Sequence, residues 1–154
     1  MAHITWTSDL NTGIQVIDEQ HKQLVAYINQ LYDAKKTKER SQIAHVIDGV
    51  VDYTMSHFAF EEAMLEDVGY EFLRPHKKVH ELFIRRVDDL RKRFNAGEDV
   101  SDELHDLLSR WLLNHIRHDD AAYVQAVRGD LQELEKDNHE GGWLKRTLGR
   151  FFGR

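Results

Sequence analysis

The feature of this sequence that most constrains its fold is a spacing of apolar residues in alternating steps of three and four, repeated in four segments. Such spacing gathers the residues on one face of an α-helix, and a helical bundle buries that face. The four inner faces are Ile17, His21, Leu24, Ile28 and Leu31; Ile43, Ile47, Val50, Thr54, His57 and Glu61; His76, His80, Phe83, Val87, Leu90 and Phe94; and Leu104, Leu108, Trp111 and His115. The sequence therefore predicts an all-α fold.

Residues that commonly begin and end helices bound these segments. The expected beginnings are Asp18 and Ser41 as capping residues, Pro75 as a first helical residue, and Ser101; the expected ends are the charged run 35–40, Gly69 and residues 95–97. The short loops favour an antiparallel up-down-up-down four-helix bundle. We expect this bundle, with an N-terminal arm that carries Trp6, to occupy residues 1–128, and a C-terminal helical extension to occupy residues 129–154.

Composition excludes several classes of protein. The chain of 154 residues is long enough for one domain, and it contains no Cys, so disulfides, zinc ribbons and thiol catalysis are excluded. The first residues lack a basic start followed by an apolar run, so no signal peptide is predicted, and no apolar stretch is long enough to cross a bilayer. We therefore expect a cytoplasmic location. A net charge of −6 argues against nucleic acid as a partner. The oligomeric state is not predicted.

Polar residues interrupt the inner faces at one end of the bundle. In an antiparallel bundle the starts of odd helices and the ends of even helices meet, so the six polar residues converge: His21, His57, Glu61, His76, His80 and His115. A buried unpaired charge costs several kcal/mol, so such a cluster needs a partner. Imidazole and carboxylate together suit first-row transition metals, and carboxylates can bridge two ions. The sequence thus predicts a two-metal site with a free coordination position for a small ligand such as dioxygen.

A second bridging carboxylate is available just after His115. Strict helical spacing favours Asp119, four residues after His115, over Asp120, and His118 is a competing donor one turn away. Spacing alone leaves this choice open.

The motifs around these residues resemble those of the hemerythrin family, most closely its single-domain bacterial members, over roughly residues 4–125. The matching stretches are the Trp6 arm, Asp18-Glu19-Gln20-His21, His57-Phe58-Ala59-Phe60-Glu61-Glu62, His76-Lys77-Lys78-Val79-His80, and Trp111-Leu112-Leu113-Asn114-His115-Ile116 with Asp120 and Tyr123.

This resemblance implies a ligand set for two non-haem iron ions joined by an oxo or hydroxo bridge. His76, His80 and His115 would bind one iron, His21 and His57 the other, and Glu61 and Asp120 would bridge them. The family spacing selects Asp120 and requires the helix to loosen after His115. The resemblance also implies an apolar ligand pocket formed by Leu24, Thr54, Trp111, Leu112 and Ile116.

The resemblance implies reversible dioxygen binding, in a carrier, store or sensor rather than in an enzyme. The alternative is an enzyme that uses the same site for an oxidase, peroxidase or nitric oxide reaction. The other five histidines lie off the inner faces, and we expect them on the surface: His3, His45, His105, His118 and His139.

The C-terminal extension ends in a basic amphipathic segment, residues 142–154. As a helix it gathers Trp143, Leu144, Leu148, Phe151 and Phe152 on one side and Lys145, Arg146, Arg150 and Arg154 on the other. Such a segment can lie on an anionic membrane or dock on a partner protein. Equally, it can pack on the acidic surface of its own bundle or be disordered. The sequence leaves both alternatives open.

Overall fold

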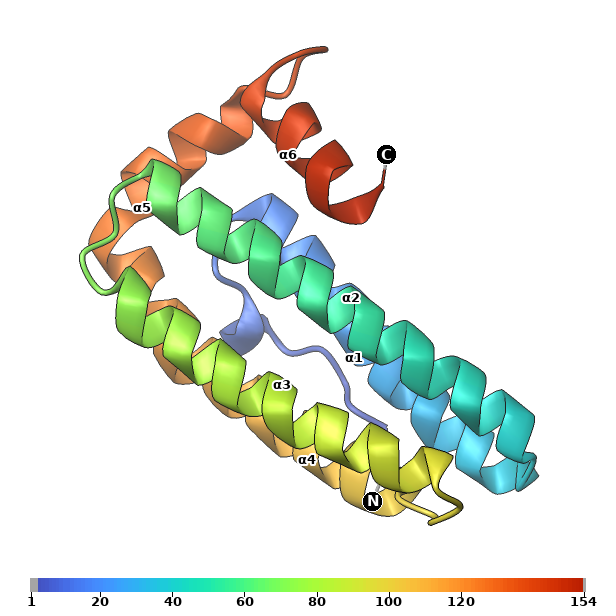
Figure 1. Cartoon of the computed structure of the whole chain (residues 1–154). Helices are drawn as coiled ribbons and strands as arrows, with labels where there is room; N and C mark the ends of the chain where they lie inside the picture. The colour runs from blue at the N-terminus through green and yellow to red at the C-terminus, as the bar shows by residue number, and fades with distance from the viewer. Residues whose placement is uncertain (1–2, 154) are drawn as a thin grey trace.

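The computed structural model describes residues 3–153, and within them it contains helices and no strand. Four long antiparallel helices form the bundle: α1 (Gln15–Thr37), α2 (Arg40–Asp67), α3 (Leu73–Asn95) and α4 (Ser101–His115) (Figure 1). Two further helices follow, α5 (Ala121–Lys136) and α6 (Trp143–Phe152). The predicted all-α bundle with an N-terminal arm and a C-terminal helical extension is confirmed. None of the helices in the described range combines the length and the apolar character needed to cross a bilayer.

Three of the four helix beginnings were predicted two to four residues too late. Helix α1 begins at Gln15, and Asp18 instead accepts hydrogen bonds from the backbone N–H groups of Thr12 and Gly13 at 2.8 and 3.2 Å. Pro75 is the third residue of α3 rather than the first. A proline is tolerated there because the first four N–H groups of a helix have no partner within it.

Helix α2 begins at Arg40, so Ser41 lies inside its first turn instead of capping it. Ser101 begins α4 as predicted. Gly69 and Gly97 follow the ends of α2 and α3 with φ of +70° and +107°, left-handed conformations that glycine adopts without a steric penalty. The predicted helix ends at these glycines are confirmed.

The N-terminal arm runs along the bundle (Figure 1). Its backbone is held at Ile4, which exchanges hydrogen bonds with the Asn29 side chain at 2.8 and 3.0 Å, and it includes a short 3₁₀ turn, η1 (Ser8–Leu10). Leu10 and Ile14 are buried. Residues 1 and 2 of the predicted arm lie outside the described residues.

Two apolar clusters fill the molecule, and the polar residues of the inner faces lie between them. The larger cluster fills the bundle and contains Leu24, Phe58 and Leu112. The smaller one contains Ile17, Phe60 and Tyr123 and continues into the C-terminal helices. Because His21 and His57 stand between members of the two clusters on α1 and α2, water is excluded from the polar layer on both sides.

Helix α6 folds back onto α2 and α5 (Figure 1). Trp143 is buried, and its indole N–H donates to Asp67 of α2 at 2.6 Å. The Phe152 ring lies 5.3 Å from that of Tyr53 and 6.1 Å from that of Phe60. The apolar side of the tail therefore packs on the chain's own bundle. Its basic side chains Lys145, Arg146 and Arg150 remain exposed.

Candidate metal centre

Five segments bring seven ionisable side chains to one end of the bundle. They are His21 from α1, His57 and Glu61 from α2, His76 and His80 from α3, His115 from α4, and Asp120 from the turn that follows α4. None of the seven is more than 6% exposed. Groups of this kind are almost never fully buried without partners, so the cluster marks a site rather than ordinary packing.

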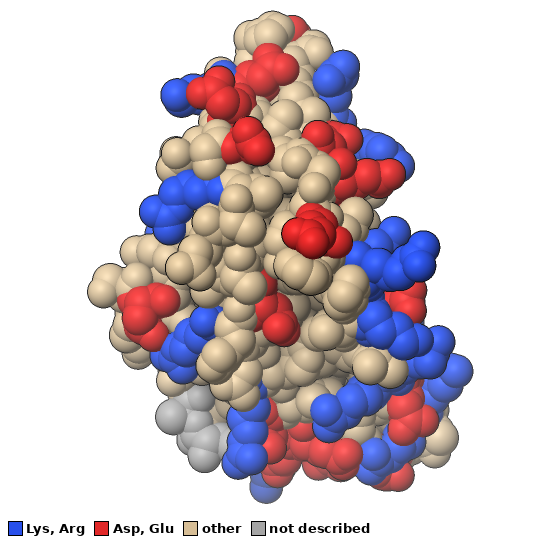
Figure 2. Space-filling view, turned by 90° about the vertical axis from the view of Figure 1, so that its left-hand side faces the viewer, with Lys and Arg blue, Asp and Glu red and all other residues tan. Residues whose placement is uncertain are grey.

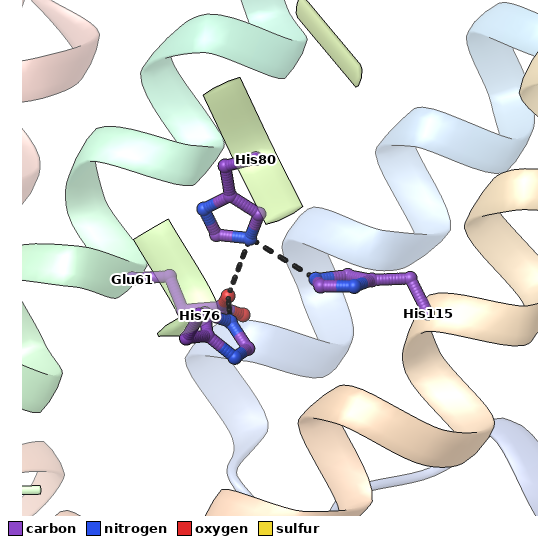
Figure 3. A group of neighbouring side chains, drawn as sticks. All are labelled: Glu61, His76, His80 and His115. Atoms are coloured by element: carbon purple, nitrogen blue, oxygen red, sulfur yellow. Dashed lines mark hydrogen bonds and ion pairs between the residues drawn. The ribbon is translucent and has the colours of Figure 1, made fainter. Parts of the chain in front are cut away.

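Glu61 occupies the centre of the cluster. Its Oε1 lies 2.7 Å from His76 Nε2 and 3.2 Å from His80 Nε2, as Figure 3 shows. Its Oε2 accepts a hydrogen bond from the Tyr123 hydroxyl at 3.0 Å and lies 3.8 Å from His57 Nε2. One carboxylate thus faces histidines on two sides.

Two groups of candidate ligand atoms share this carboxylate. The first is Glu61, His76, His80 and His115, and the second is His21, His57 and Glu61; within each group the atoms lie within 4.8 Å of one another. The Nε2 atoms of His80 and His115 are 3.0 Å apart. Nitrogen atoms that converge in this way, with a carboxylate between the groups, form a donor set suited to two transition-metal ions.

The turn after α4 decides which aspartate enters the cluster. Residues Ile116–Asp120 form a π-helical turn, η2, in which the chain is wound more loosely than in an α-helix. Asp120 points inward, with its carboxylate oxygens 3.1 Å from His21 Nε2 and 3.2 Å from His115 Nε2. Asp119 instead bonds the outer nitrogen of His115, Nδ1, at 2.7 Å. The structure therefore places Asp120 among the histidines and Asp119 outside them.

Several polar atoms of the cluster have no hydrogen bond within the described residues. They are both ring nitrogens of His21 and both carboxylate oxygens of Asp120, all of which are buried. An unsatisfied buried polar atom costs about 1–3 kcal/mol. A metal ion would satisfy the inward nitrogen of His21, Nε2, and the Asp120 carboxylate at once. The seven residues therefore fit a pair of metal ions on chemical grounds as well as on geometry.

Three of the five rings are held from outside through Nδ1. His57 bonds Gln20 at 2.7 Å, His80 bonds Glu62 at 2.8 Å, and His115 bonds Asp119 at 2.7 Å. A partner on Nδ1 fixes the ring orientation and leaves Nε2 free for a metal. Sequence reasoning did not assign Gln20 or Glu62. They lie 37 and 18 residues from the histidines that they bond, and no local spacing indicates such pairs.

Burial and neighbouring charges shift the pKa values of the histidines in this cluster in opposite directions. Burial lowers the pKa of His57 to about 3. Burial also opposes the charged form of His115, but Asp120 and Asp119 outweigh it and raise the pKa of His115 to about 10. Burial and Glu61 oppose ionisation of Asp120, yet His115 and His21 hold the pKa of Asp120 at about 2. At neutral pH the metal-free site therefore holds an ionised Asp120, a neutral His57 and a protonated His115.

Four of the five residues expected to line the ligand pocket lie in or against the larger apolar cluster, and Thr54 does not. Leu24, Leu112 and Ile116 are buried in the larger apolar cluster. Trp111 is half-buried, and its ring stacks on His115 with centroids 4.3 Å apart. The Thr54 hydroxyl donates to the Val50 carbonyl at 2.6 Å, so it is turned back onto its own helix.

One of the five histidines expected on the surface is buried. His105 is 3% exposed and lies against Tyr32 of α1, with ring centroids 5.6 Å apart. The prediction was wrong because the buried face of α4 is wide enough to include the residue next to Leu104. His3, His45, His118 and His139 are exposed as predicted.

Comparison with known proteins places these features in a family. The model of the hemerythrin HHE cation binding domain matches residues 12–127. Bacteriohemerythrin of Pseudomonas aeruginosa (strain UCBPP-PA14) is 65% identical over 99% of this chain and 100% of its own length. That of Stenotrophomonas maltophilia (strain R551-3) is 54% identical over the same shares. A crystal structure of wild-type hemerythrin, 33% identical, superposes with a TM-score of 0.77 over 80% of this chain and 97% of its own.

Proposed function

The chain belongs to the hemerythrin family, and from this premise we propose that it binds dioxygen reversibly at a centre of two non-haem iron ions. His76, His80 and His115 would hold one iron, His21 and His57 would hold the other, and Glu61 and Asp120 would contribute to both. The observation that carries the proposal is the pair of ligand groups that share Glu61 but contain three and two histidines. Unequal groups leave one ion with a position for an external ligand.

When bound, the two ferrous ions supply the open position and the electrons for reversible dioxygen binding. The chain's own residues supply the surroundings. Leu24, Leu112 and Ile116 exclude water from the pocket, which limits the arrival of protons. Thr54 and Tyr123 have their hydroxyl protons engaged by Val50 and Glu61. A pocket wall without a free proton donor favours release of the ligand unchanged, and so a binding protein over an enzyme.

Absorption spectroscopy tests the proposal. The protein is loaded with ferrous iron without oxygen, its iron content is measured, and spectra are recorded under nitrogen, after oxygenation and after purging. We expect two iron ions per chain and an absorption change that purging reverses. A chain that retains no stoichiometric iron would refute the proposal. Continued consumption of oxygen or peroxide over many turnovers would support the enzymatic alternative instead.

Two histidine variants serve as a matched pair in this experiment. His21→Ala removes a buried histidine that is a proposed ligand. His118→Ala makes the same chemical change at an exposed histidine. We expect His21→Ala to lose iron and the reversible absorption change, whereas His118→Ala keeps both.

Other sequence predictions stay predictions. They are the division between residues 128 and 129, a cytoplasmic location, the absence of nucleic acid as a partner, and a membrane or protein partner for residues 142–154. For that last segment, the packing of Trp143 and Phe152 on the bundle supports an intramolecular role.

A further inference from the structure

Helix α3 carries a charge opposite to that of the rest of the chain. It holds eight of the 21 Lys and Arg residues but only three of the 27 Asp and Glu residues. The helix therefore carries +5, although the whole chain carries −6. In Figure 2, Lys and Arg side chains gather along the right-hand side, with some Asp and Glu between them; this is the side that faces the viewer in Figure 1, where α2 and α3 lie. The chain thus concentrates positive charge on one face.

Residues 73–86 of α3 differ from residues 87–95 in how their charges are paired. In residues 87–95, Arg91, Lys92 and Arg93 all form ion pairs with nearby carboxylates. In residues 73–86, Arg74, Lys77, Arg85 and Arg86 form none with any described residue, and Lys78 forms one 3.8 Å pair with Glu81 between exposed side chains. Positive charge in residues 73–86 therefore remains available to an external partner.

Exposed apolar side chains lie around this same part of the helix. Phe72, Leu82 and Met55, which are 56%, 49% and 47% exposed, are the only large apolar residues exposed within the described chain. Phe72 precedes α3, and Leu82 lies between Lys78 and Arg85 along it. Met55 lines a groove of about 260 Å³ between α2 and α3, beside Arg85. Aromatic residues, Met and Arg are enriched in protein interfaces, which have a polar rim.

This surface lies directly over the candidate metal centre. The first half of α3 carries His76 and His80 on its inner face. The outer nitrogen of His80 bonds Glu62, whose side chain is 23% exposed. A single hydrogen-bonded carboxylate therefore connects a proposed iron ligand to the solvent beside this surface.

We propose that the surface formed by Arg74, Lys77, Lys78, Arg85, Phe72, Leu82 and Met55 docks a small acidic electron-carrier protein. The proposal rests on the proposed function. An iron pair that has been oxidised to the ferric state no longer binds dioxygen, and it needs two electrons to recover. In each encounter one reduced carrier loses one electron and one ferric ion becomes ferrous, with any proton that the bridging oxygen takes up coming from solvent, so two encounters restore the pair. Weak, electrostatically steered contacts of small area suit such brief encounters.

The test uses an acidic [2Fe–2S] ferredoxin as the probe. Its binding to this protein is measured by calorimetry in 20 mM and 500 mM NaCl, and the rate at which the reduced ferredoxin reduces the oxidised iron protein is followed by stopped-flow absorption. Lys78→Glu/Arg85→Glu reverses two charges on the proposed surface. The matched control, Lys145→Glu/Arg146→Glu, makes the same change in net charge on α6, where both residues are exposed.

We expect the bimolecular rate to fall by roughly tenfold or more in Lys78→Glu/Arg85→Glu at low salt, and by less than about twofold in the control. The salt dependence of the wild-type rate should largely disappear in the first variant. Iron content and reversible oxygenation should be unchanged in both variants. Equal losses in both variants would overturn the proposal, because net charge alone would then explain them.

Two further results bear on the proposal. Binding of phosphatidylserine vesicles or duplex DNA to this surface, with no binding of ferredoxin, would overturn it in favour of another class of partner. If the wild-type protein formed no iron centre, the proposed function would fail. Calorimetry on the metal-free protein and its two variants would still decide whether the surface docks the acidic protein.

Discussion

Replacing Asp120 and Asp119 separately by Asn distinguishes the inner carboxylate from the outer one. Asp120 is fully buried and lies 3.1 and 3.2 Å from His21 and His115. Its pKa of about 2 and that of His115 of about 10 mean that the two are oppositely charged in the metal-free protein at pH 7. The Asp119 side chain is 44% exposed and bonds the outer nitrogen of His115. The two substitutions should therefore have very different effects.

In the metal-free protein, Asp120→Asn removes the buried counter-ion of the His115 imidazolium, and only the partly exposed Asp119 remains beside that ring. Loss of one partner of a buried pair costs about 3 kcal/mol, at the low end of measured values, since His115 can then lose its proton. For a chain of this length, that loss lowers the midpoint of thermal unfolding by about 10 °C. Asp119→Asn breaks a partly solvated pair worth about 1 kcal/mol or less, so its midpoint should fall by about 4 °C at most.

In the iron-loaded protein, Asp120→Asn removes a bridging carboxylate, and we expect fewer than two iron ions per chain after gel filtration. Asp119→Asn keeps both ions but with an affinity about 10–100-fold weaker, because only the support of one ring is lost. Thermal unfolding after chelator treatment and iron analysis after loading provide the two measurements. If Asp119→Asn alone lost an iron ion while Asp120→Asn kept both, the assignment from the structure would be wrong.

Three other predictions follow from the site and the tail. The pKa of His115 is raised to about 10, so its proton must leave when a metal binds. The apparent metal affinity, measured by chelator competition, should therefore fall about tenfold for each pH unit from pH 8 down to pH 6. An affinity independent of pH would contradict this. Thr54→Val should change the autoxidation rate by less than about twofold, because the Thr54 hydroxyl is already bonded to Val50. Leu112→Ser should raise the autoxidation rate by roughly tenfold, because it brings a hydroxyl among the buried apolar side chains. A marked effect of Thr54→Val would show that its hydroxyl reaches the ligand. Deletion of residues 142–154 should lower thermal stability by about 3 kcal/mol through loss of buried Trp143 without changing iron content, and liposome binding that the deletion abolishes would instead support a membrane role.

The sequence was sufficient for the helices and for the set of residues that face inward. The alternating spacing placed His21, His57, His76 and His80 on buried faces, and all four are buried. Helix order then brought them to one end of the bundle, since antiparallel helices alternate in direction. Their role as iron ligands stays a prediction. Helix beginnings were less accurate, because Asp18 and Pro75 suit more than one position in a first turn.

The fourth helix shows where local spacing reaches its limit. Strict α-helical geometry selected Asp119, and only the family spacing selected Asp120. The π-helical turn at Ile116–Asp120 explains why Asp120 and not Asp119 faces the histidines, because it inserts an extra residue into the turn and rotates Asp120 inward. Such a turn has no reliable local signal in the sequence, and the surroundings must stabilise it.

What the sequence determined by itself is the all-α fold, the direction of each helix and the identity of the buried polar residues, because all three follow from helical periodicity and chain order. Tertiary structure alone decided that Glu62 and Gln20 orient the rings of His80 and His57, that His105 is buried, and that α6 packs on α2. The physical reason is distance along the chain. Each of these contacts joins side chains on different helices, and their approach depends on how the helices pack rather than on the spacing within any one of them.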